Sequence, residues 1–109
     1  MSDRFQDREK GFERKFQLDQ EQQFRAGARR DKLFGQWAAR KLGYSGAALD
    51  TYATAVVDSN FEKPGDDDML TKVKTDFSFA NVEASDAELT RQLQECAAIA
   101  AKEIVSESK

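Results

Sequence analysis

The chain has 109 residues, a formal net charge of −3 and no histidine. Its length predicts one domain with one core, and it has no apolar run near the roughly 20 residues that span a bilayer. The charged N-terminus does not resemble a signal peptide, and the lack of histidine removes the usual proton shuttle, metal ligand and switch near neutral pH.

The first 17 residues carry a narrow row of aromatic side chains. On a helix, Phe5, Phe12 and Phe16 fall within about 20° of one line. Nine of the fifteen residues from 3 to 17 are charged. A helix that packs on its own core normally has an apolar stripe at least about 100° wide. The pattern therefore predicts a segment that docks its three rings in a groove on a partner.

The charges in this segment disfavour a helix on its own. Up to residue 14, every charged pair four residues apart has like charges: Asp3 with Asp7, Arg4 with Arg8, Glu9 with Glu13 and Lys10 with Arg14. Each pair costs roughly 0.2–0.5 kcal/mol, and Gly11 costs about 1 kcal/mol, which opposite charges three residues apart partly offset. Two interpretations follow: a tail that is disordered when free and helical on a partner, or a charged helix folded back on its own body.

The next segment, residues 18–42, has a stronger helical pattern and should join the core. Its apolar side chains are Phe24, Ala28, Leu33, Phe34, Trp37, Ala38 and Leu42. Gly27 and Gly35 weaken the helix slightly, but a glycine on a packed helix also lets a neighbour approach closely. Gly43 is a suitable residue to end the helix, with Arg40 and Lys41 in the last turn.

A second helix is predicted over residues 46–60, with Ser45 as its N-cap. Phe61 should close the apolar side of this helix, and residues 62–65, which include Pro64, should turn the chain. The apolar side consists of Leu49, Tyr52, Ala53, Val56 and Val57.

Two further helices are predicted over residues 66–80 and 86–106. Asp66, Asp67 and Asp68 open the first of them, and Ser85 with Glu88 forms a capping box for the second. The residues expected to face the core are Met69, Leu70, Val73, Phe77, Leu89, Leu93, Cys96, Ala97, Ala100 and Ile104. The expected fold is an all-α four-helix bundle (residues 18–109) with a flexible or partly helical N-terminal extension (residues 1–17).

The charge of the chain is unevenly distributed. Residues 1–41 hold eleven Lys and Arg against seven Asp and Glu, whereas residues 42–109 hold six against thirteen. This polarity can orient the protein on a partner. Because the chain is acidic as a whole, we expect no general binding to nucleic acid.

No pattern in the sequence indicates catalysis or a metal site. There is no glycine-rich phosphate loop, no triad and no Cys and His spacing for a metal. The spacing of Asp66 to Asp68 matches no calcium loop. Cys96 has no partner in the chain and should be a buried structural thiol. We therefore expect no enzyme and a function carried by a surface.

Two stretches resemble a known family. Residues 28–39, ARRDKLFGQWAA, and residues 7–16, DREKGFERKF, resemble the zeta subunit of the alphaproteobacterial F-type ATP synthase. The resemblance extends over essentially the whole chain and includes Leu42-Gly43, Tyr52, Val56-Val57, Asp58, Phe61 and Gly65 to Asp68.

The resemblance implies a regulatory subunit that needs no cofactor. Its N-terminal segment would enter the interface between catalytic subunits, against the central stalk, and block rotation during ATP hydrolysis. The implied partner-binding residues are Arg4, Phe5, Arg8, Glu9, Lys10, Phe12, Glu13, Arg14 and Phe16. The expected protein is cytoplasmic and monomeric when free, does not insert in the membrane, and lies at the inner face of the cell membrane when bound to the synthase.

The resemblance also implies ATP or ADP as a regulatory ligand. Arg29, Arg30 and Lys32 could meet phosphate and Trp37 could meet the base. Alternatively, these cations form a solvated face over a buried Leu33 and Trp37. A rival function for the whole chain is a small nucleotide-sensing or RNA-associated helical module without control of an ATPase. A third interpretation is that the N-terminal segment packs on its own bundle and the protein only assists assembly.

Overall fold

The computed structural model describes residues 18–61 and 65–107, which form four α-helices joined by short loops. The helices are α2 (Gln20–Lys41), α3 (Gly46–Ser59), α4 (Asp67–Phe79) and α5 (Asp86–Glu107), and each begins and ends within two residues of its predicted bounds. The prediction of an all-α four-helix fold is confirmed, and these two ranges contain no strand. None of the four helices has the length and apolar character needed to cross a membrane.

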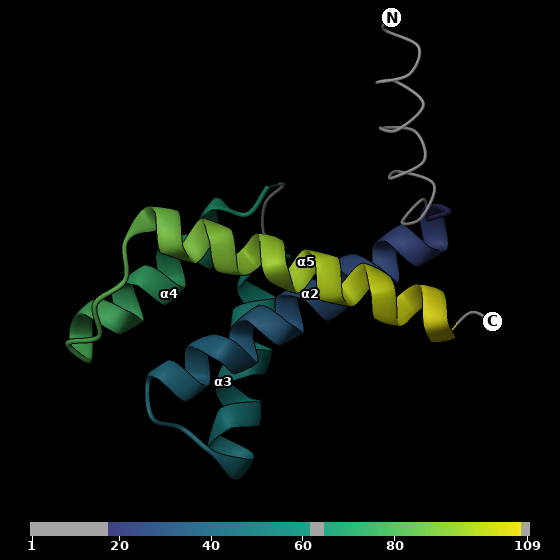
Figure 1. Cartoon of the computed structure of the whole chain (residues 1–109). Coiled ribbons are helices and arrows are strands. Elements are labelled where there is room, and N and C mark those ends of the chain that lie inside the picture. Colours follow the sequence, from purple (N-terminus) through teal and green to yellow (C-terminus); the bar gives the residue numbers. More distant parts are fainter. Residues whose placement is uncertain (1–17, 62–64, 108–109) are drawn as a thin grey trace, which may run out of the picture.

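The helix α2 lies at the centre of the arrangement, with α5 packed along it on one side and α3 on another (Figure 1). The helix α4 packs on α3, and its apolar side chains complete the core. Since α2 and α5 run antiparallel, the beginning of α2 lies beside the end of α5, where Arg25 and Glu107 form an ion pair. The point at which the N-terminal segment joins the body is therefore next to the last turns of α5.

The helix ends largely follow the local sequence. Gly43 has φ of 90°, the left-handed conformation that suits glycine after a helix. Ser45 is the N-cap of α3, although its side chain makes no capping hydrogen bond. The N–H of Glu88 donates to Oγ of Ser85 at 3.1 Å, which is one half of the predicted capping box.

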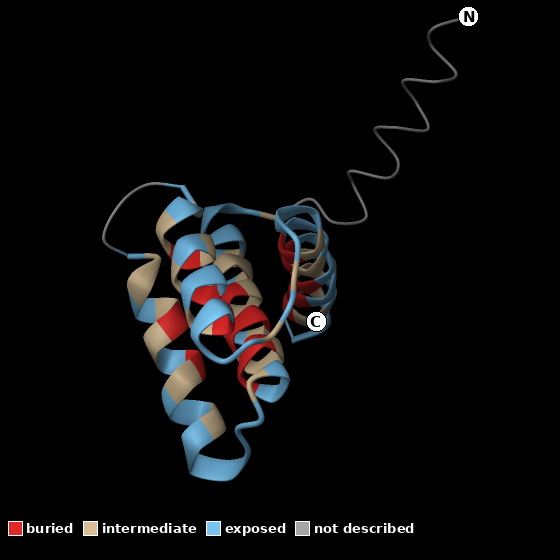
Figure 2. Cartoon of the chain, turned by 90° about the vertical axis from the view of Figure 1, so that its left-hand side faces the viewer, coloured by how far each residue is buried: buried red, intermediate tan, exposed pale blue. Residues whose placement is uncertain are grey.

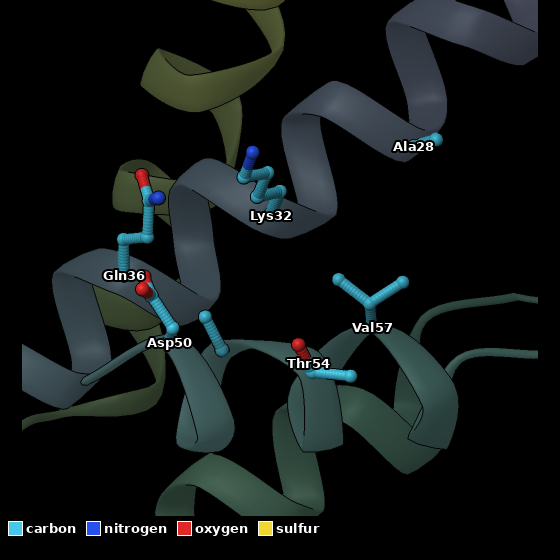
Figure 3. Close-up of a pocket in the computed structure, with 7 residues that line it drawn as sticks. Ala28, Lys32, Gln36, Asp50, Thr54 and Val57 are labelled. Carbon is cyan, nitrogen blue, oxygen red and sulfur yellow. The ribbon is translucent and has the colours of Figure 1, made fainter. Parts of the chain in front are cut away.

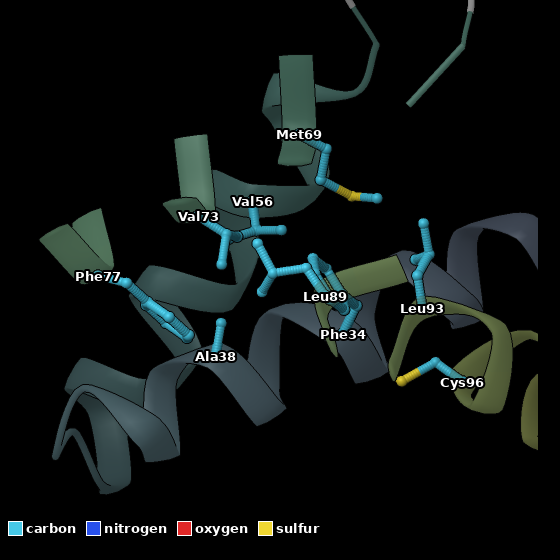
Figure 4. Close-up of a cluster of buried hydrophobic side chains, with 9 residues drawn as sticks. All are labelled: Phe34, Ala38, Val56, Met69, Val73, Phe77, Leu89, Leu93 and Cys96. Carbon is cyan, nitrogen blue, oxygen red and sulfur yellow. The ribbon is translucent and has the colours of Figure 1, made fainter. Parts of the chain in front are cut away.

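The core gathers apolar side chains from all four helices. Figure 4 shows its main cluster, which comprises Phe34, Ala38, Val56, Met69, Val73, Phe77, Leu89, Leu93 and Cys96. Phe34 of α2 is fully buried at its centre. In Figure 2 the buried positions line the inner faces of the helices, while the outer faces are exposed. All nine of these residues except Phe34 and Ala38 follow residue 55, so the core joins distant parts of the chain.

The helices α2 and α3 pack closely at Gly35. A Cβ atom built there would lie 2.9 Å from Cα of Ala53, closer than carbon atoms can pack. A Cβ atom on Gly27 would meet nothing within 4 Å. The expectation that a glycine permits close helix packing is thus confirmed for Gly35 and wrong for Gly27.

Two predictions of burial are wrong. Phe24 is 70% exposed and Phe61 is 65% exposed. The helix α2 spans about 33 Å and α3 only about 21 Å, so α3 does not cover the first turns of α2, where Phe24 lies. Phe61 follows the end of α3, where the chain has already left the helix. Its side chain therefore cannot close the apolar face.

Candidate functional site

The residues predicted to bind the partner lie outside the described residues. They are Arg4, Phe5, Arg8, Glu9, Lys10, Phe12, Glu13, Arg14 and Phe16. The structure does describe the junction through which this segment enters the body. That junction consists of Leu18, Asp19 and the first turn of α2.

A complete capping box begins α2 at this junction. Oδ1 of Asp19 accepts a hydrogen bond from the N–H of Gln22 at 2.7 Å, and the side chain of Gln22 accepts one from the N–H of Asp19 at 3.1 Å. The side-chain amide of Gln23 also donates to the carbonyl oxygen of Leu18 at 2.9 Å. The two bonds between Asp19 and Gln22 satisfy backbone N–H groups that a helix start leaves unpaired. The chain therefore enters α2 at a sharply defined residue.

Arg29, predicted to contact nucleotide, is engaged within the protein. Its Nη1 lies 2.7 Å from Oε1 of Glu103, and its Nη2 lies 2.9 Å from Oε2 of Glu107. Arg25 approaches the same Glu107 at 3.4 Å. Hydrogen bonds to Glu103 and Glu107 raise the pKa of Arg29 above its usual value. The guanidinium of Arg29 thus ties α2 to the last turns of α5.

Arg30 points to the other side of α2 and joins a polar network. Its Nη2 lies 2.7 Å from Oδ1 of Asp66 and 2.8 Å from Oδ1 of Asp31. Burial works against the charged form of Arg30, but the hydrogen bonds and charges of Asp31 and Asp66 outweigh it and raise the pKa. Asp31 is only 6% exposed. An apolar periodicity could not predict the burial of this charged residue.

Asn60 completes this network at the end of α3. Its Nδ2 donates to Oδ2 of Asp31 at 2.9 Å and to Oδ1 of Asp66 at 3.2 Å. Two carboxylate acceptors fix the orientation of the amide, which leaves its buried Oδ1 without a hydrogen-bond partner among the described residues. The network joins α2 to both ends of the loop between α3 and α4, so we assign it a structural role.

Lys32 lies beside a groove between α2 and α3. The groove has a volume of about 500 Å³ (Figure 3). It is lined by Ala28, Lys32, Gln36, Asp50, Ala53, Thr54 and Val57. Lys32 is the only cation in this lining, and Asp50 stands on the α3 side of the groove. The groove could hold a small ligand with an apolar part and one anionic group.

The last predicted nucleotide-binding residue, Trp37, packs between aromatic rings. Its ring centroid lies 5.6 Å from that of Phe34, in a stacked arrangement, and 5.8 Å from that of Phe77. Nζ of Lys41 lies 5.9 Å from the Trp37 ring. The structure therefore does not bring Arg29, Arg30, Lys32 and Trp37 together around one site.

The described residues include no candidate metal site and one buried thiol. Among them, no three or more acidic, cysteine or histidine side chains are placed to hold a metal ion. Cys96 is a free thiol and is buried, as predicted. Burial raises the pKa of the Cys96 thiol and so disfavours the reactive thiolate.

Sequence reasoning missed the acidic partners of the arginines. Glu103 and Glu107 are spaced four residues apart on α5, and Arg25 and Arg29 have the same spacing on α2. Such like-charged pairs are unfavourable within a helix, which favours partners of opposite charge on a neighbouring helix. The sequence shows the two like-charged pairs, but it does not show that they face each other across α2 and α5.

The chain was compared with protein families and with curated proteins. The model of the family ATPase inhibitor subunit zeta matches residues 1–103. The comparison with individual curated proteins gave no significant match. The family match includes both the N-terminal segment and nearly all of the described body. This chain belongs to the ATPase inhibitor subunit zeta family.

Proposed function

We propose that this chain inhibits ATP hydrolysis by an F-type ATP synthase by inserting residues 1–17 at a catalytic subunit interface, against the central stalk. The observation that carries the proposal is the family match, which begins at residue 1 and includes this segment. The row formed by Phe5, Phe12 and Phe16 suits a groove on another protein, because rings on one helix face act as anchors when they are buried.

The arrangement of the body supports the same proposal. Among the described residues, side chains from all of α2 to α5 form the main core cluster, which supports a bundle with its own core that carries the segment. The partners would be catalytic and stalk subunits, and the chain would act in the cytoplasm at the inner face of the cell membrane. Its role is regulatory, and any response to pH must work without histidine.

The direct test replaces the anchoring rings. Phe12→Ala and Phe16→Ala should each raise the half-inhibitory concentration for ATP hydrolysis by roughly 30-fold or more, because a buried anchoring ring contributes about 2–4 kcal/mol. The measurement is a titration of isolated ATP synthase heads with purified full-length chain. Phe79→Ala is the matched control, since Phe79 is 85% exposed at the end of α4.

The outcomes separate the proposal from its rival. Unchanged hydrolysis at micromolar wild-type chain would contradict an inhibitory role for this protein. A nucleotide-sensing or RNA-associated module would leave hydrolysis unaffected by all of these variants. Equal effects of Phe12→Ala and Phe79→Ala would show that ring loss acts through general folding.

For the regulatory ligand, we propose that ATP or ADP binds in the groove between α2 and α3. The supporting observation is that Lys32, and none of the other three predicted residues, lines this groove. Lys32→Gln should weaken ADP binding roughly tenfold, since loss of a charged contact to phosphate costs about 1.5–3 kcal/mol. Isothermal titration calorimetry measures the affinity of each variant for ADP. Lys102→Gln, an exposed change on α5, should leave the affinity unchanged; equal losses would place the nucleotide elsewhere.

A further inference from the structure

Four charged side chains join the beginning of α2 to the end of α5. Arg25 and Arg29 come from α2, and Glu103 and Glu107 come from α5; we refer to them as the charge clasp. Arg29 spans both glutamates, at 2.7 Å and 2.9 Å, and Glu107 also receives Arg25 at 3.4 Å. In Figure 1 the two helix ends lie side by side, close to where the chain enters α2.

Each of the two helices carries one like-charged pair of the clasp. The two arginines are four residues apart on α2 and repel each other, as do the two glutamates on α5, at roughly 0.2–0.5 kcal/mol per pair. Glu107 also stands in the last turn of α5, where the helix dipole disfavours an anion and where no basic residue is present. The two like-charged pairs are therefore unfavourable within their own helices and are offset by the ion pairs across α2 and α5, although Glu21 also stands four residues before Arg25 on α2.

The clasp also adds little to the stability of the whole bundle. The side chains of Arg25, Glu103 and Glu107 are more than 40% exposed, and such surface ion pairs contribute little each. The buried core already holds the bundle through residues such as Phe34, Val73 and Ile104. The role of the clasp therefore depends on where it lies rather than on the stability of the whole bundle.

That position is the part of α2 that contains no buried residue. None of residues 20–30 is buried, and the first buried residue of α2 is Asp31. The clasp lies between Asp31 and the capping box at Asp19. Arg25 and Arg29 thus hold the turns that connect the core to the preceding segment, and Ile104 of α5 lies at the same end of α5 as both glutamates.

We propose that the charge clasp positions the N-terminal inhibitory segment, with Arg29 as its principal positioning residue. This inference rests on the proposed function. With the clasp closed, the first turns of α2 are already ordered and directed along α5 when the segment docks. With the clasp open, binding must order those turns as well, and each residue ordered costs about 1–2 kcal/mol. The clasp therefore strengthens inhibition without touching the partner.

Charge reversal tests the positioning role. The double variant Glu103→Arg/Glu107→Arg, which leaves α2 unchanged, should raise the half-inhibitory concentration at least about tenfold, which corresponds to the cost of ordering about one residue on binding. It should also speed amide hydrogen exchange over residues 20–28 while leaving the thermal unfolding midpoint of the bundle nearly unchanged. Adding Arg25→Glu and Arg29→Glu restores opposite charges across the helices and should recover both inhibition and exchange protection.

A control variant and three contrary outcomes complete the test. Lys74→Glu is the control. Lys74 and Asp86 form another exposed ion pair, 2.8 Å apart, and reversing the charge of Lys74 should change neither inhibition nor amide exchange over residues 20–28. If the double reversal inhibits like the wild type, the positioning role is overturned. If the fourfold exchange recovers protection but not inhibition, the arginines act directly on the partner, which also overturns it. A wild-type chain that fails to inhibit overturns the proposed function itself.

Discussion

A chain that lacks residues 1–17 is expected to remain folded and to lose inhibition of ATP hydrolysis completely. The expected loss exceeds roughly 100-fold, because three anchoring rings worth about 2–4 kcal/mol each are removed together. The bundle should survive, since its main core cluster runs from Phe34 to Cys96 and its capping box begins at Asp19. Circular dichroism and thermal unfolding report the fold, and titration of isolated ATP synthase heads reports inhibition.

A matched control keeps the composition of the segment and destroys its pattern. A full-length chain in which residues 1–17 are rearranged so that no two phenylalanines share a helix face should be as inactive as the truncated chain. If the truncated chain still inhibits, the body carries the activity. If truncation unfolds the bundle, the segment is part of its core, as in the alternative in which it folds back on its own body.

The glycines of α2 are expected to respond in opposite directions to the same substitution. Gly35→Ala should lower the free energy of unfolding by about 1–3 kcal/mol, because the new methyl group meets the backbone of Ala53 and the two helices must separate. The distance from that methyl to Cα of Ala53 would be 2.9 Å. Gly27→Ala should raise the same free energy by up to about 1 kcal/mol, since alanine favours the helix.

Urea unfolding of both variants measures the difference, which should be about 1–4 kcal/mol. Because both positions lie on one helix and receive the same methyl group, intrinsic helix preference cancels between them. Equal stabilisation of both variants would mean that α2 and α3 do not pack as closely at Ala53 as described. A large loss at Gly27 would place another chain segment over that position.

Local sequence determined the helices and their ends. Gly43 and Ser85 act on their immediate neighbours, so their effects could be inferred without knowing the rest of the molecule. Burial depends instead on how far a neighbouring helix extends. Phe24 lies on the apolar side of α2, yet α3 does not reach it, and its exposure could not be read from α2 alone.

The candidate site was less predictable for the same reason. Arg29 and Arg30 are adjacent in sequence, but Arg29 pairs with Glu103 on α5 and Arg30 pairs with Asp66, the residue before α4. The neighbouring basic residues Arg29 and Arg30 therefore do not form one basic surface. The residues predicted to bind the partner lie outside the described residues, so their role stays a prediction that rests on the row of rings and on the family match.

The side-by-side placement of the α2 beginning and the α5 end has a practical consequence for experiments. An affinity tag or fluorescent protein fused after Glu107 would stand beside Arg25, next to the exit of residues 1–17. Such a fusion would obstruct access to a large partner and imitate loss of function. Surface attachment or dye labelling is better directed to the turn between α4 and α5, around Glu83, at the opposite end of α5.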